Sequence, residues 1–102
     1  MTLKEMQEHV RELREAQGWR DESPERRAMF LVTELGEVAR ETLKLSGAYG
    51  QLADADHRQA RENLGMEMYD ILWNLCDLAN LLGIDLEAAS ARKAAINRLR
   101  KW

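Results

Sequence analysis

The sequence has 102 residues, of which 45% are hydrophobic and 32% are charged. This balance is typical of a folded domain rather than a disordered chain, and the length allows one domain with a modest core over residues 1–102. The net charge of −3 argues against broad nucleic-acid binding, which needs a basic surface. No apolar run approaches the roughly 20 residues that span a bilayer, so we expect no membrane segment and no signal peptide.

The single cysteine, Cys76, excludes a disulfide within the chain and suits a reducing compartment. It lies among Leu72, Leu75 and Ala79, so we interpret it as a buried, inert thiol rather than a nucleophile. We therefore expect a cytoplasmic protein. Because so short a helical chain has little interior of its own, we also expect it to assemble into an oligomer.

Helical spacing and end signals predict the first two elements. Apolar residues recur at helical spacing over residues 3–17, and Gly18 ends this segment. A polar link follows at residues 19–23. Ser23 has the chemistry of an N-cap and Pro24 suits the first helical position, so a second helix begins there and continues to about Leu45.

Two further helices follow a glycine-containing loop. The third begins between residues 54 and 62, continues to Leu82 and ends at Gly83. Asp85 is the expected N-cap of a fourth helix over residues 86–99. No segment shows convincing strand alternation. The expected fold is therefore all-α, a four-helix bundle-like chain with helices in the order short, long, long, short.

Two acidic pairs interrupt the two long helices at the same spacing. Glu34 and Glu37 lie in LVTELGEVA, and Glu67 and Asp70 lie in LGMEMYDILWNL. Residues three apart share one face of a helix, one turn from each other. If the two helices pack antiparallel, the pairs meet and form an oxygen-rich cluster.

Four carboxylates in one place repel one another and are costly to bury unless a cation neutralises them. Mg²⁺ suits such all-oxygen ligation, with waters and substrate phosphates completing its shell, and Mn²⁺ is the natural substitute. Either pair alone is more often part of a solvated acidic face. The apolar setting of both pairs favours the metal site.

Three longer segments extend this pattern: LVTELGEVARE, EMYDILWNLCDLANLLGIDL and KAAINRLR. Together they resemble the MazG-like nucleotide pyrophosphohydrolases of the all-α NTP pyrophosphatase group, over nearly the whole chain. The resemblance implies hydrolysis of a nucleoside or deoxynucleoside triphosphate to its monophosphate and pyrophosphate. It implies that four carboxylates bind Mg²⁺ and that the first two are also the candidate catalytic residues, Glu34 most of all as base: Glu34, Glu37, Glu67 and Asp70.

The chain departs from this family at Thr33, where many members carry the first of two adjacent glutamates. A shorter ExxE form also occurs in the group. Thr33 keeps open a second hypothesis, a degenerate member that binds nucleotide or metal without turnover. A third hypothesis is a helical interaction protein whose acidic pairs are surface features.

The predicted last helix carries Lys93, Asn97 and Arg100 on one face, and the family tail has similar residues. The resemblance implies that Lys93 and Arg100 lie near phosphates and that Asn97 bonds the base or sugar. A solvated basic helix end that complements the helix dipole explains them equally well. By the same analogy we expect a homodimer or homotetramer.

Two tryptophans and one asparagine complete the expected site. By the same resemblance, Trp19 of the polar link is expected to stack on the nucleobase. Trp73, one turn after Asp70, either lines the same pocket or packs in the core or a subunit interface. Asn74, four residues after Asp70 on an apolar helix, is a candidate partner that orients it.

Overall fold

The structure is a computed structural model that describes residues 1–19 and 23–102. Residues 20–22 of the predicted polar link lie outside the described residues. The described residues form four helices: α1 (Leu3–Gln17), α2 (Pro24–Leu45), α3 (Asp54–Leu82) and α4 (Leu86–Leu99). The described ranges contain no strand, so the all-α prediction is confirmed.

The helix ends follow the signals in the sequence. Ser23 and Asp85 each accept a hydrogen bond from the backbone N–H three residues later, at 3.1 and 3.0 Å, so both are the predicted N-caps. Gly18 and Gly83 end α1 and α3 with φ at 68°, a left-handed conformation that glycine adopts without steric cost. Helix α3 begins at Asp54, the early limit of the predicted range.

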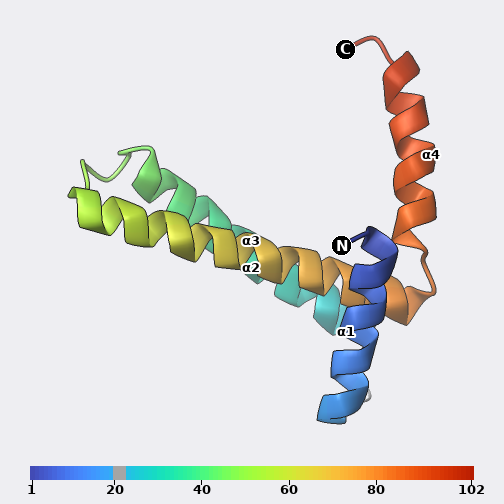
Figure 1. Cartoon of the computed structure of the whole chain (residues 1–102). Coiled ribbons are helices and arrows are strands. Elements are labelled where there is room, and N and C mark those ends of the chain that lie inside the picture. The colour runs from blue at the N-terminus through green and yellow to red at the C-terminus, as the bar shows by residue number, and fades with distance from the viewer. Residues whose placement is uncertain (20–22) are drawn as a thin grey trace.

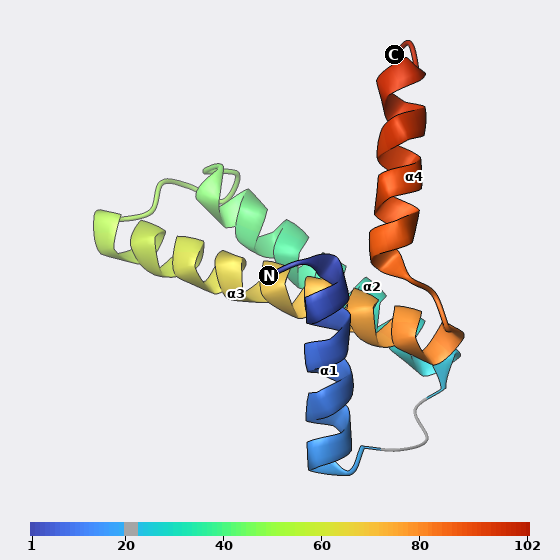
Figure 2. The ribbon, with the colours of Figure 1, turned by 45° about the vertical axis from the view of Figure 1, so that its right-hand side comes forward.

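Helices α2 and α3 form a long antiparallel hairpin, and α1 crosses α3 near the C-terminal end of that helix (Figure 1). Helix α4 projects away from the hairpin, as Figure 2 shows from a second direction. It contacts mainly α1 and contains no buried residue. The fold is bundle-like, with one helix that lies largely outside the bundle.

A small apolar core lies where α1 crosses α3. Met6 and Val10 of α1 are buried against Cys76 of α3, with Trp73 and Leu86 packed around them. Cys76 is 1% exposed, which confirms that it is buried. Burial raises the pKa of its thiol and so disfavours the reactive thiolate.

A buried carboxylate joins the first three helices. Asp77 of α3 is 1% exposed, and Arg14 of α1 donates to both of its oxygens, at 2.8 and 2.6 Å. Nε of Arg27 on α2 lies 3.0 Å from the same carboxylate. Charge-assisted pairs of this kind are directional, so the junction fixes α1, α2 and α3 relative to one another.

A second polar junction holds the start of α4. The buried side chain of Gln7 on α1 donates to Oδ1 of Asn80 at 3.0 Å and to the carbonyl of Ile84 at 2.8 Å. It accepts from the backbone N–H of Leu86 at 2.9 Å. The connection between α3 and α4 is therefore tied to α1, while the rest of α4 extends outward.

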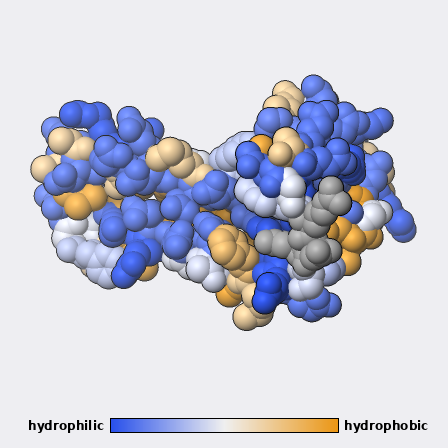
Figure 3. All heavy atoms as spheres, turned by 90° about the horizontal axis from the view of Figure 1, so that it is seen from below, coloured by the Kyte–Doolittle hydropathy of each residue, from blue (hydrophilic) through white to orange (hydrophobic). Residues whose placement is uncertain are grey.

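The chain is open for its size. Its accessible surface is 7837 Å² and its radius of gyration is 16.7 Å. A compact protein of 11.8 kDa would have about 5,900 Å² and about 13 Å. Hydrophobic side chains reach the surface among hydrophilic ones in Figure 3. Within the described residues, no helix has both the length and the apolarity to cross a membrane.

Candidate functional site

Three of the four predicted carboxylates meet between the two long helices. Glu34 of α2 and Glu67 and Asp70 of α3 each offer an oxygen atom, and these atoms all lie within 4.8 Å of one another. Glu67 and Asp70 are one turn apart on α3, and the antiparallel hairpin places Glu34 opposite them. The predicted meeting of the acidic pairs is therefore present for three of the four carboxylates.

Glu37, the fourth predicted ligand, is exposed and is not part of this three-residue group. It still acts on the group through Glu67. Loss of water contact raises the pKa of Glu67, and the neighbouring carboxylates of Glu37 and Glu34 raise it further, to about 7. Within the acidic cluster (Glu34, Glu37, Glu67 and Asp70), Glu67 therefore favours the uptake of a proton or a cation near neutral pH.

The donor set of the acidic cluster fits a hard divalent cation. Oε2 of Glu34 is covered from solvent and has no hydrogen-bond partner in the described part of the chain. A buried carboxylate oxygen without a donor is costly, and a cation removes that cost. All four groups offer oxygen, as Mg²⁺ and Mn²⁺ prefer.

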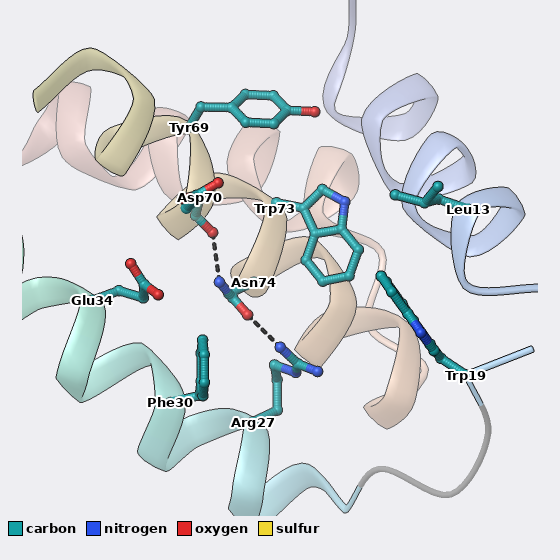
Figure 4. Close-up of a pocket in the computed structure, with 9 residues that line it drawn as sticks. All are labelled: Leu13, Trp19, Arg27, Phe30, Glu34, Tyr69, Asp70, Trp73 and Asn74. Atoms are coloured by element: carbon teal, nitrogen blue, oxygen red, sulfur yellow. Dashed lines mark hydrogen bonds between the residues drawn. The ribbon is translucent and has the colours of Figure 1, made fainter. Parts of the chain in front are cut away.

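A cavity of about 510 Å³ adjoins the cluster and has the size of a small-molecule site. Glu34 and Asp70 lie at one end of it and Trp19 lies at the other (Figure 4). Its lining residues come from α1, α2, α3 and the segment after α1: Leu13, Trp19, Arg27, Phe30, Glu34, Tyr69, Asp70, Trp73 and Asn74. We call it the aromatic pocket.

Both tryptophans that the sequence singled out line the aromatic pocket. The rings of Trp19 and Trp73 meet edge to face, with centroids 6.2 Å apart and planes at 78°. Trp19 is 48% exposed, so its ring has surface available to a ligand. Trp73 also packs against the apolar core, so its ring occupies both of the predicted positions, at the pocket and at the core.

Asn74 contacts Asp70 as predicted, but at the backbone. Its Nδ2 donates to the carbonyl oxygen of Asp70 at 2.7 Å rather than to the carboxylate. Its Oδ1 accepts from Nη1 of Arg27 at 2.5 Å. Sequence reasoning missed Arg27, although it lies seven residues before Glu34 and therefore on the same helix face.

Phe30 and Tyr69 are further lining residues that the sequence analysis missed. The guanidinium of Arg27 lies 5.7 Å from the ring centroids of both Phe30 and Trp73. Burial lowers the pKa of Arg27, and the nearby carboxylate of Asp77 opposes this effect. The spacing of Phe30, four residues before Glu34 on the same helix face, would have identified it, whereas Tyr69 directly precedes Asp70 and helical spacing gives no such signal.

The structure does not bring the predicted residues of α4 to the acidic cluster of their own chain. Lys93 and Arg100 are exposed, Asn97 is half-buried, and none of the three lines the aromatic pocket. The guanidinium of Arg100 lies 4.3 Å from the ring centroid of Trp102 instead. Helix α4 points away from α2 and α3 in both ribbon views (Figures 1 and 2).

Two curated proteins are similar to the chain. It is 28% identical over 89 residues to the uncharacterized protein YvdC of Bacillus subtilis (strain 168), covering 85% of this chain and 84% of that protein. It is 41% identical over 59 residues to the dATP/dGTP diphosphohydrolase of Cyanophage S-2L, covering 58% of this chain and 52% of the phage protein. The chain thus spans about half the length of the phage protein. No protein-family profile and no solved structure matches it.

Proposed function

We propose that this chain is a nucleoside triphosphate pyrophosphohydrolase that releases pyrophosphate and a nucleoside monophosphate. The observation that carries the proposal is the meeting of Glu34, Glu67 and Asp70 at the end of the aromatic pocket. In this proposal the three carboxylates bind a cation that contacts the phosphates, and the adjoining pocket receives the nucleobase. The similarity to a phage dATP/dGTP diphosphohydrolase and the MazG-like motifs support the same activity.

Each part of the site has a distinct task in this proposal. The acidic cluster would hold Mg²⁺, which supplies Lewis-acid stabilisation of charge on the phosphate oxygens. Glu34 is the proposed base that accepts the proton of the attacking water, and Glu37 supports it from the next turn. Trp19 and Trp73 are proposed to hold the base by stacking and to keep water from that end of the pocket.

We also propose that the chain acts as a homo-oligomer. Its surface exceeds that of a compact protein of its mass by about 1,900 Å², whereas a standard interface buries about 800 Å² per partner. Helix α2 carries a second apolar face, with Val32, Leu35 and Leu43 exposed by 63%, 53% and 43%. A second copy of the chain would cover this face.

An oligomer also gives the residues of α4 a site to act on. In its own chain α4 extends away from the acidic cluster, so Lys93 and Arg100 would meet the phosphates in the site of a partner copy. Their positive charge is complementary to phosphate and to the negative cluster. Asn97, whose covered Oδ1 has no partner among the described residues, would bond the base or sugar there.

A catalytically inactive nucleotide-binding protein is the second candidate, and Thr33 favours it. The side chain of Thr33 is exposed, and its hydroxyl donates to the carbonyl of Met29 at 3.5 Å. It therefore adds no carboxylate to the acidic cluster. In this case the pocket would bind nucleotide without hydrolysing it.

Release of pyrophosphate from a panel of NTPs and dNTPs, with Mg²⁺ or Mn²⁺, tests the proposal. We expect the wild-type chain to release pyrophosphate, and Glu37→Gln and Asp70→Asn to lower kcat by at least about 100-fold while helicity is kept. Glu41→Gln is the matched control, since Glu41 lies one turn beyond Glu37 and pairs with Lys44. Nucleotide binding without release in the wild type would support the inactive alternative. Full activity in both variants would remove the site assignment.

A further inference from the structure

Asn74 is a buried amide on α3 with both ends engaged. It is 5% exposed, its Nδ2 donates to the backbone carbonyl of Asp70, and its Oδ1 accepts from Arg27. Asp70 lies about one turn before Asn74, and Glu67 lies about two turns before it. All three therefore share the side of α3 that faces α2. A buried amide that uses donor and acceptor in this way has one fixed orientation.

Arg27 is the other end of this link, and it is held firmly. Its Nη1 donates to Asn74 at 2.5 Å, and its Nε lies 3.0 Å from the carboxylate of Asp77. Its guanidinium lies beside two aromatic rings of the pocket. Arg27 also precedes Glu34 by two helical turns, so the link is close to the acidic cluster on both helices.

The acidic cluster needs such a link. Across α2 and α3 the carboxylate of Glu34 faces those of Glu67 and Asp70, and negative charges this close together experience repulsion. Moving the two helices apart would relieve it and would also separate the oxygen atoms that lie within 4.8 Å of one another. The bond between Arg27 and Asn74 crosses the same helix pair and opposes that movement.

Resting on the proposed metal site, we propose that Arg27 and Asn74 are positioning residues of the acidic cluster. Their hydrogen bond fixes the separation of α2 and α3 at which the cluster binds a divalent cation. The junction at Asp77 connects this hydrogen bond to α1, so the positions of the carboxylates are fixed before a cation or nucleotide binds. Neither residue contacts the reacting phosphates in this role.

The test is Mn²⁺ affinity, measured on the full chain by the loss of the free Mn²⁺ signal in electron paramagnetic resonance. Asn74→Leu, Arg27→Met and the double variant R27M/N74L are compared with the wild type. The double variant removes both partners of the hydrogen bond, so neither is left without the other. Circular dichroism checks that this variant is folded. We expect each variant to bind Mn²⁺ about 10- to 100-fold more weakly.

Asn80→Leu is the matched control. Asn80 is an amide on α3 that bonds Gln7 of α1, so its loss weakens an interhelical junction without touching the pair of α2 and α3. We expect its Mn²⁺ affinity to stay within about twofold of the wild type. Electrostatics alone would act in the opposite direction, because removing the positive charge of Arg27 beside carboxylates favours cation binding.

The outcomes separate the two proposals. Unchanged or tighter Mn²⁺ binding in a folded R27M/N74L chain would overturn the positioning role and leave the metal site standing. An equal loss in the Asn80→Leu chain would assign the effect to general stability and overturn the role as well. Absence of Mn²⁺ binding in the wild type would overturn the metal centre itself.

Discussion

At the scale of single residues, Glu67 is the carboxylate of the acidic cluster whose negative charge is least favourable. It faces Glu34 and Asp70 across 4.8 Å or less, and Glu37 adds to the repulsion. Loss of water contact, and then the neighbouring carboxylates of Glu37 and Glu34, raise its pKa from 4.5 to about 7 in the folded chain. Because the folded pKa lies above the unfolded one, ionised Glu67 destabilises the folded chain. That cost is absent below pH 4.5, grows as the pH rises, and is complete above pH 7.

The variant Glu67→Gln tests directly whether the ionised carboxylate of Glu67 destabilises the folded chain. In the presence of a chelator we expect it to raise Tm above that of the wild type at pH 8, by roughly 2–5 °C because water screens part of the repulsion. The difference should vanish as the pH falls through 7 towards 4.5, where wild-type Glu67 is protonated. Added Mg²⁺ should reverse the order. A difference in Tm that does not depend on pH would refute this destabilisation. Thermal denaturation followed by circular dichroism gives the measurement.

At the scale of helices, the sequence predicts features that depend on neighbouring residues but not contacts between distant segments. Ser23, Asp85 and the two terminating glycines act within a few residues of the sequence, and capping chemistry identifies them. The i,i+3 spacing of the acidic pairs is equally local. The junction of Arg14 with Asp77 joins residues 63 positions apart, and the sequence around either residue does not identify its partner. For the same reason the sequence does not predict that Arg27, Phe30 and Tyr69 line the pocket beside the predicted tryptophans, carboxylates and Asn74.

The junction at Asp77 predicts a large loss of stability in Asp77→Asn. Two guanidinium groups, those of Arg14 and Arg27, would lose the buried carboxylate between them, which typically costs about 3–5 kcal/mol. Urea denaturation followed by circular dichroism measures this loss. Glu62→Gln, an exposed change on the same helix, is the control and should shift the free energy of unfolding by less than about 0.5 kcal/mol. Similar values for both variants would show that the junction contributes little.

At the scale of the whole molecule, the open shape and the projecting position of α4 have one common explanation in the proposed oligomer. Local periodicity predicts α4 and its basic face, but it carries no information on where the helix lies relative to α2 and α3. The structure shows α4 anchored at its start by Gln7 and extended beyond that point. An excess of exposed surface and a projecting helix with complementary charge are what a chain that completes its sites in pairs would have.

Mixing two inactive variants tests whether α4 acts on the site of a partner. Asp70→Asn disables the cluster, and Lys93→Ala with Arg100→Ala disables α4. If α4 acts on its own chain, every site in a mixed dimer keeps one defect and no activity returns. If α4 acts across the dimer, one site of each mixed dimer has an intact cluster and an intact α4, while the other has both defects.

Random pairing of equal amounts makes about half of the dimers mixed, so about a quarter of all sites should be intact. We therefore expect the mixture, after unfolding and refolding together, to recover about a quarter of the wild-type pyrophosphate release. Each variant refolded alone is the control and should remain inactive. Sedimentation velocity confirms that the refolded chains are dimers. Recovery at the background level in verified mixed dimers would place the action of α4 within its own chain, or remove it from the site.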